Sequence, residues 1–346
     1  MSQYIVSSSP HIANKRTVSG IMLEVLIALA PAVIASVIFY GFYALFLEIL
    51  SVGAAVGTEA LYNRVMKRDQ TVKDCSAMVT GLLLALNIPV SAPFYVPVIG
   101  SAFAILFVKM LFGGIGKNFA NPAITARIFL LLAWASVMTS FVKPILWSGG
   151  AKEIFKYFAC IVKGPSGLGD VAAVTSATPL ASLREGAEKV KDLPLLAMFL
   201  GNTGGSLGET SALAVLLGGV YLIIRRIIDW RVPTVYLATV ALFAMIYGAA
   251  KGAVGAYILP SLLGGGLMLG AFFMATDYAT SPNTKTGLVV YAVGLGLITS
   301  LIRFFGNYPE GVSFAILLMN IVTPFIDKFI RPRPFGFVKQ GKGGAK

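Results

Sequence analysis

The sequence predicts an all-α integral membrane protein of about ten transmembrane helices, arranged as two inverted five-helix repeats. The chain of 346 residues is 57% hydrophobic and only 12% charged, whereas a soluble domain carries about 25% charged residues. Apolar stretches of roughly 20 residues recur along the whole length, and each can cross a bilayer as a helix. Similar polar breaks recur five spans apart, and an odd number of spans reverses the direction through the membrane.

The apolar stretches divide the chain into three parts. We expect an N-terminal half with five spans (1–142), a long extracytoplasmic loop (143–208), and a C-terminal half with five spans and a basic tail (209–346). Prolines close to the third and eighth spans make these two the least regular. The expected spans are 21–40, 42–61, 75–91, 95–112, 124–142, 209–226, 233–250, 254–275, 287–305 and 311–327.

Two pairs of segments indicate the inverted repeat. GGIGKNFANPAITARIFLLL, from Gly113, is similar to RFFGNYPEGVSFAILLMN, from Arg303, and LALNIPVSAP, from Leu84, is similar to FMATDYATSP, from Phe273. In each pair polar residues and a proline interrupt the apolar sequence, as in the broken helices of inverted-repeat membrane proteins. Chance recurrence is the alternative, because all turns favour Gly, Asn and Pro.

Basic residues predict the orientation. With a cytoplasmic N-terminus, most Lys and Arg fall on the inside, and the short outside loops contain only Lys251. Both termini are therefore expected in the cytoplasm, and the loop 143–208 on the outer face. The formal net charge is +13, but these residues cluster at the ends of spans, so we expect the lipid bilayer and no nucleic acid as a partner. The inside residues include Lys15, Arg16, Arg64, Lys67, Arg68, Lys73, Lys117, Arg225, Arg226, Arg231, Lys285 and the tail from Lys328.

Cysteine and histidine are scarce. Cys75 and Cys160 lie far apart without a CxxC motif, and an iron–sulfur cluster usually needs four thiolates. His11 has no partner for metal binding, so no metal site is expected. No small-residue cleavage site follows Lys15 and Arg16 before the first span, so we expect no cleavable signal.

Several polar residues at membrane depth require a reason. Asn118, Asn121 and Asp277 interrupt apolar sequence, which is tolerated where protein or a polar cavity covers the backbone. They indicate a ligand between the halves near the inner side; the alternative is that they are cytoplasmic turn residues. Glu59 lies in a glycine-rich run and is a candidate cation-handling group or a structural partner. Other ionisable residues in or beside spans are Glu24, Glu48, Lys109, Arg127 and Arg303.

The outer loop contains DVAAVTSATPLASLREG at 170–186, in which Thr175, Ser176 and Thr178 precede Pro179. Such hydroxyls can form a phosphate ester with a phosphorylated cofactor. The sequence GNTGGSLGETSALAVLL follows from Gly201, and a glycine-rich loop at a helix N-terminus suits a phosphate. An ordinary helix cap is the alternative. The residues of this candidate phosphate site are Gly204, Gly205, Ser206, Glu209 and Thr210.

Nearly the whole chain resembles the D subunit of the Rnf complex (RnfD) and its relative, the B subunit of the sodium-translocating NADH:quinone reductase (NqrB). In this family FMN is attached through its phosphate to the last threonine of a Ser/Thr-x-Ala-Thr motif, which is Thr178 here. The family often has an acidic residue close upstream, whereas Asp170 is five residues before Thr175. The similar segments are SSPHI at 8–12, MLEVLIALAPA at 22–32, GIGKNFANPA at 114–123, TSATPLA at 175–181, GGSLGETSA at 204–212 and ATDYATSP at 275–282.

The resemblance implies an electron-relay subunit in the inner (cytoplasmic) membrane of a prokaryote. Such a complex moves electrons between ferredoxin and NAD and exports Na+ or H+. The implied partners are the A, B, C, E and G subunits of the Rnf complex, with the flavin-bearing G subunit closest, and a flavin transferase for maturation.

Relatives also bind non-covalent riboflavin, for which Asn118, Asn121 and Asp277 are plausible surroundings. Glu59 and Asp277 are the expected ion-pathway residues. A solute channel or secondary transporter, or an anchor without a cofactor, is the alternative. TSATPLA with the glycine-rich loop favours the flavin protein, because a channel has no use for it.

Overall fold

The computed structural model describes residues 16–142, 180, 183, 188, 190, 192–201, 203–306 and 310–331. Within these ranges the regular structure is almost entirely helical. Thr175, Ser176 and Thr178 lie outside the described residues.

Among the described residues, five helices are long and apolar enough to cross a membrane. This confirms the prediction of a helical membrane protein. They are α1 (Val18–Tyr40), α2 (Phe42–Val65), α12 (Arg231–Ala250), α15 (Lys285–Phe305) and α16 (Val312–Phe329).

The remaining apolar segments form shorter or interrupted helices. The segment expected at 254–275 is broken at Gly264–Gly266, where Gly265 has a φ of +67° that favours glycine. The helix expected at 75–91 ends at Leu86, before Pro89. These elements are α3 (Ser76–Leu86), α4 (Tyr95–Phe103), the π-helix η2 (Ala104–Met110), α5 (Pro122–Ala133), α11 (Ala212–Ile224), α13 (Ile258–Leu263), α14 (Leu267–Leu269) and the π-helix η4 (Gly270–Met274). Short elements are η1 (Val72–Asp74), α6 (Ala135–Met138) and α10 (Leu195–Leu200).

Polar caps define where several helices begin. Thr17 and Thr284 accept backbone hydrogen bonds at the starts of α1 and α15. Asn121 caps α5, whose first residue is Pro122. The sixth apolar segment begins at Ala212 and not at Glu209, because Ser211 Oγ accepts the hydrogen bond from Ala214 N.

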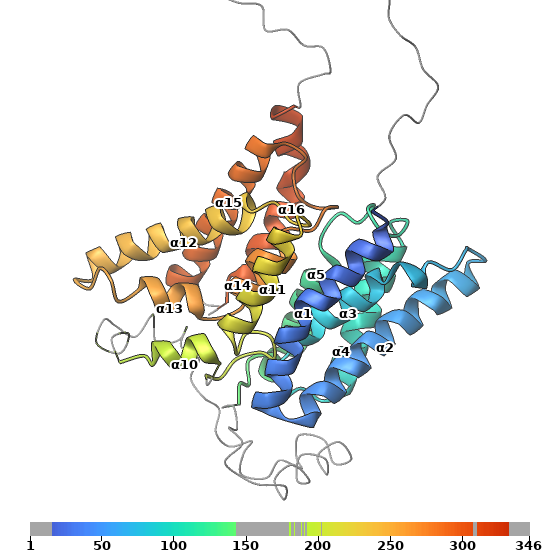
Figure 1. Ribbon diagram of the computed structural model, residues 1–346, viewed down its shortest axis with the longest axis horizontal. Helices are drawn as coiled ribbons and strands as arrows, with labels where there is room; N and C mark the ends of the chain where they lie inside the picture. The colour runs from blue at the N-terminus through green and yellow to red at the C-terminus, as the bar shows by residue number, and fades with distance from the viewer. Residues whose placement is uncertain are drawn as a thin grey trace, which may run out of the picture.

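The chain forms two groups of helices that pack side by side (Figure 1). Helices α1–α5 lie in one group and α11–α16 in the other, with α1 packed along α11. One continuous apolar core joins the groups and includes Leu29, Leu86, Leu207 and Ile316. The start of α1 and the end of α16 lie at the same side of the molecule, at the top of the view.

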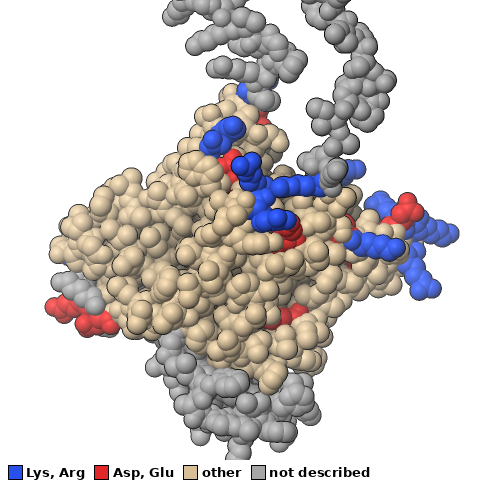
Figure 2. Space-filling view, in the orientation of Figure 1, with Lys and Arg blue, Asp and Glu red and all other residues tan. Residues whose placement is uncertain are grey.

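The outer faces of the long helices are apolar. On α1, the exposed residues Leu23, Ile27, Ile34 and Ile38 occur at helical spacing and are each about half exposed. Figure 2 shows a wide uncharged surface across the middle of the molecule, with Lys and Arg gathered above it, on the side where α1 begins. The uncharged band matches the hydrocarbon layer of a bilayer. The side with Lys and Arg matches the lipid headgroup region.

The α1–α11 contact depends on Gly218. A Cβ atom added there would lie 1.9 Å from the carbonyl oxygen of Ala28. We expect Gly218→Ala to destabilise the protein by about 1–3 kcal/mol, because overpacking forces the two helices apart. Thermal unfolding in detergent would measure this.

The matched control is Gly57→Ala in α2, where an added Cβ meets nothing within 4 Å. This variant is expected to unfold at or slightly above the wild-type temperature, because Ala is the better helix former. Equal midpoints for the two variants would contradict the close approach of α1 and α11.

Candidate functional site

A cavity of about 350 Å³ lies between the two groups of helices. This volume is within the range of small-molecule sites, roughly 300–1,000 Å³. Its walls are mostly apolar, with a few polar groups, as is typical of cofactor pockets. They include Met22, Val25, Val79, Thr80, Leu83, Lys109, Asn118, Asn121, Ala123, Leu222, Phe272, Phe273 and Asp277.

The sequence-predicted residues Asn118, Asn121 and Asp277 all line this cavity. Asn121 Oδ1 accepts from Ala123 N at 3.0 Å, and Asn121 Nδ2 donates to the carbonyl oxygen of Met274 at 3.1 Å. The same side chain therefore caps α5 and binds the end of η4 in the other group.

Asp277 begins the turn that follows η4. Its carboxylate accepts from Ala279 N and from Thr280 Oγ1, each at 3.3 Å. Burial raises the pKa of this carboxyl group, while these hydrogen bonds and one from Asn118 oppose the rise. The sequence left two alternatives for Asp277, a turn residue or a residue beside a ligand. In the structure its carboxylate accepts hydrogen bonds within the turn, and the residue also lines the cavity.

Glu59 forms a buried ion pair. Lys109 Nζ lies 2.8 Å from Glu59 Oε2, and the two side chains are 3% and 0% exposed. Lys109 Nζ also donates to Ser76 Oγ, and Thr71 Oγ1 donates to Glu59 Oε1. Lys109 lines the cavity, so the pair connects the cavity wall to the turn at Thr71.

Both π-helices border the cavity. Lys109 lies on η2, and Phe272 and Phe273 lie on η4. Single π-helical turns within α-helices occur frequently at functional sites. Their presence on two walls of one cavity strengthens its assignment as a ligand site.

A smaller cavity of about 50 Å³ lies beside the glycine-rich loop. Gly204 and Gly205 line it, together with Leu180, Gly264 and Gly265. The other residues of the predicted phosphate site bind one another: Ser206 N donates to Glu209 Oε2 at 3.3 Å, and Thr210 Oγ1 donates to Ser206 O at 3.0 Å.

The glycine-rich loop is held against the end of α3. Gly208 N donates to Leu86 O at 2.7 Å and Leu207 N donates to Ile88 O at 3.1 Å. These two backbone groups are therefore engaged, and the loop faces the cavity through Thr203, Gly204, Gly205 and Glu209.

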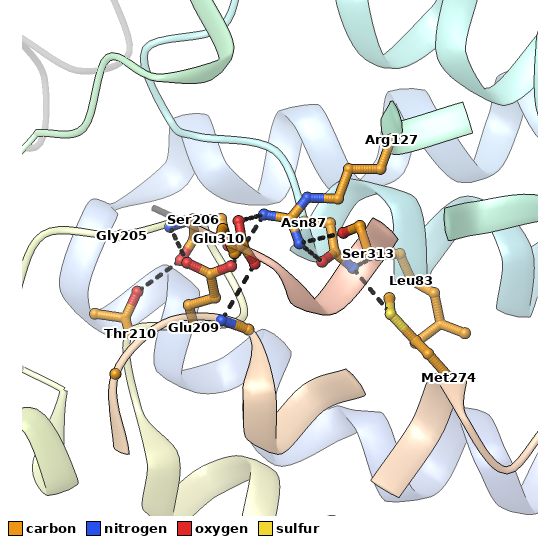
Figure 3. A network of polar contacts seen from close by, with 12 residues as sticks. Leu83, Asn87, Arg127, Gly205, Ser206, Glu209, Thr210, Met274, Glu310 and Ser313 are labelled. Atoms are coloured by element: carbon orange, nitrogen blue, oxygen red, sulfur yellow. Dashed lines mark hydrogen bonds and ion pairs between the residues drawn. The ribbon is translucent and has the colours of Figure 1, made fainter. Parts of the chain in front are cut away.

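A buried network surrounds Arg127 on α5 (Figure 3). Arg127 Nη2 lies 3.1 Å from Glu209 Oε1 and also binds Glu310 Oε2. Arg127 Nη1 donates to Asn87 Oδ1 at 2.8 Å and to Ser313 Oγ at 3.1 Å. The sequence alone did not single out Asn87, Glu310 or Ser313, although all three lie within the repeated segments.

Two packed groups of apolar helices, with cavities and buried charges between them, are typical of a multi-span membrane protein. The model of the NQR2, RnfD, RnfE family matches residues 5–336. The chain belongs to this family, as the sequence motifs predicted.

Relatives match over almost their full length. The chain is 46% identical to the D subunit of the Na(+)-translocating ferredoxin:NAD(+) oxidoreductase complex of Acetobacterium woodii, over 96% of each chain. It is 41% identical to the D subunit of the proton-translocating ferredoxin:NAD(+) oxidoreductase complex of Clostridium ljungdahlii, also over 96% of each. The D subunit of the ion-translocating oxidoreductase complex of Stutzerimonas stutzeri is 39% identical over 95% of each.

The Glu59–Lys109 pair predicts a strong coupling between two substitutions. Lys109→Met leaves the Glu59 carboxylate buried without its cation, and breaking such a pair costs about 3–5 kcal/mol. The double variant Glu59→Gln/Lys109→Met removes both charges and is expected to recover much of this loss. Unfolding of the single and double variants in detergent measures the coupling, and purely additive effects would contradict the buried pair.

Proposed function

We propose that this chain is the D subunit of an ion-translocating ferredoxin:NAD+ oxidoreductase complex and that it relays electrons within the membrane. The observation that carries the proposal is the match to the three named relatives along 95–96% of both chains. The A, B, C, E and G subunits of the complex are its proposed partners, with G closest to the outer loop. We place the complex in the cytoplasmic membrane of a prokaryote.

The proposed arrangement has ten membrane crossings in two inverted repeats, with both termini in the cytoplasm. The gathering of basic residues on the side where α1 begins supports this orientation. The long loop then lies on the outer face, where the flavin transferase attaches FMN.

FMN is proposed to be bound covalently to Thr178 through its phosphate. Leu180 lines the small cavity beside Gly204 and Gly205. Leu180 follows Thr178 by two residues in the sequence. Gly204 and Gly205 carry no side chain into this cavity, which leaves room there for a phosphate or ring edge.

Riboflavin is the proposed ligand of the larger cavity. Its volume of about 350 Å³, its apolar walls with Phe272 and Phe273, and its polar groups at Asn118 and Asp277 fit a flat ring system with hydrogen-bonding edges. A flavin would supply one-electron and two-electron redox chemistry there. The protein's side chains hold and orient the ring and exclude water.

A solute channel or secondary transporter is the competing proposal, because two halves with broken helices also fit transporters. The two classes differ in a simple observation. A flavin protein keeps yellow colour and flavin fluorescence after denaturing electrophoresis, whereas a channel or a cofactor-free anchor shows neither.

The flavin site predicts distinct outcomes for neighbouring hydroxyls. Thr178→Ala is expected to abolish covalent flavin, because it removes the oxygen that forms the phosphate ester. Ser176→Ala is expected to keep most of it and serves as the matched control. Mass spectrometry of the tryptic peptide identifies the modified residue, and FMN on Thr175 or Ser176 would overturn the assignment to Thr178.

Glu59 and Asp277 are the proposed ion-pathway residues. Glu59→Gln and Asp277→Asn are each expected to keep fluorescent FMN on Thr178 while ion-coupled ferredoxin:NAD+ electron transfer falls. The assay must include complex assembly, because loss of the partner of Lys109 also destabilises the protein. An assembled Glu59→Gln complex with unchanged turnover and ion stimulation would remove Glu59 from the pathway.

A further inference from the structure

The two carboxyl groups at Arg127 are close neighbours. Glu209 Oε1 and Glu310 Oε2 both contact the same nitrogen, Arg127 Nη2. The Glu209 side chain is 6% exposed and that of Glu310 is 16% exposed. The two groups come from opposite ends of the C-terminal half and converge on an arginine from the N-terminal half (Figure 3).

The two carboxyl groups share one cation. Both are largely buried and both contact the same nitrogen of Arg127, and two carboxylates that share a site repel each other, which favours a proton on one of them. In the proposed resting state one member of the pair therefore carries a proton. The pair then has a charge of −1, which Arg127 balances.

Other groups around the pair complete its electrostatic surroundings. Arg303 of α15 acts on both carboxyl groups and donates to Ser261 O at 2.6 Å and to Gly264 O at 3.1 Å. Tyr40 of α1 interacts electrostatically with Glu209, and Tyr236 of α12 interacts electrostatically with Glu310. Asn87, just after α3, and Ser313 of α16 accept hydrogen bonds from the other nitrogen of Arg127.

A further polar group lies next to the pair. The hydroxyl of Ser206 is fully buried and has no hydrogen-bond partner within the described residues. The backbone N–H of the same residue binds Glu209 Oε2. A hydroxyl that both donates and accepts can pass a proton to an adjacent carboxylate.

The pair lines the small cavity and is linked to the large one through a short series of contacts. Arg127, Glu209 and Glu310 line the small cavity. In the other direction Asn87, which binds Arg127, also contacts Met274 Sδ at 3.7 Å, and Met274 O accepts from Asn121 on the wall of the large cavity. Charges in either cavity therefore act on the pair through protein of low dielectric constant.

We propose that Glu209 and Glu310 form a proton-binding site that takes up one proton from solvent when an electron arrives on an adjacent flavin. The pair then becomes neutral, and the positive charge of Arg127 balances the electron. When the electron leaves, the proton returns to solvent, and the original charge balance is restored. The inference rests on the proposed function, since it needs a redox group in one of the cavities.

Infrared difference spectroscopy of the whole complex tests the site. Reduction by ferredoxin is expected to add a C=O band of a protonated carboxyl group, which shifts in D2O. Glu209→Gln and Glu310→Gln are each expected to abolish this band and to flatten the pH dependence of the flavin potential. The control is Glu24→Gln, which removes the partner of Arg225 at the α1–α11 surface and should keep the band.

The single variants are expected to assemble, because glutamine has nearly the same shape as glutamate and its amide can donate a hydrogen bond to the remaining carboxylate. If neither assembles, Glu209→Asp and Glu310→Asp retain a titratable group and should shift the band. If covalent flavin is present and the band is unchanged in either set of variants, the inference is wrong. Absence of flavin from the wild-type complex would instead refute the proposed function.

Discussion

Backbone that leaves the helical path inside a hydrocarbon layer must find all its hydrogen-bond partners within the protein. This constraint explains how the two halves meet. The carbonyl groups after α3 accept from Leu207 N and Gly208 N, and Gly266 N donates to Glu310 Oε1. Met274 O, at the end of η4, accepts from Asn121 Nδ2. Each interrupted segment is thus completed by residues from another part of the chain, and the interface follows from these bonds.

Close backbone approach is a consequence of the same bonds. A Cβ atom at Gly208 would lie 2.8 Å from Leu86 Cβ, and one at Gly266 would lie 2.6 Å from Glu310 Oε1. Only glycine allows the donors at these positions to reach their acceptors. Glycine is therefore a structural requirement at Gly208, whereas a Cβ atom added at Gly205, which faces a cavity, would meet only Glu209, at 3.5 Å.

Hydrophobic patterning was sufficient to predict the helical membrane fold, because long apolar segments have few alternatives to a membrane-spanning helix. The interruptions could be anticipated only in part. Pro89 marks the end of α3, but the pattern did not show that the helix already ends at Leu86, or that Ser211 caps α11. The sequence grouped Asn118, Asn121 and Asp277, and they do share a cavity. Local sequence patterns could not predict the network around Arg127. The partners of Arg127 lie 40 to 186 residues from it along the chain, and only the packing of the two halves brings them together.

Buried charges add little to stability and are often no better than apolar packing, because desolvation offsets their attraction. Stability alone therefore does not account for both the Arg127 network and the Glu59–Lys109 pair.

The relatives are named for different ions, Na+ in one case and protons in another, at 46% and 41% identity to this chain. A proton-binding carboxyl pair is compatible with either ion. The site that balances charge at a flavin need not be the site that binds the ion carried across the membrane. The small cavity of about 50 Å³, with Arg127 occupying one side of both carboxyl groups, suits a proton and leaves few directions for the several oxygen ligands of a metal cation. The proposed carboxyl pair therefore concerns charge balance at a flavin, and the proposed ion pathway at Glu59 and Asp277 is separate from it.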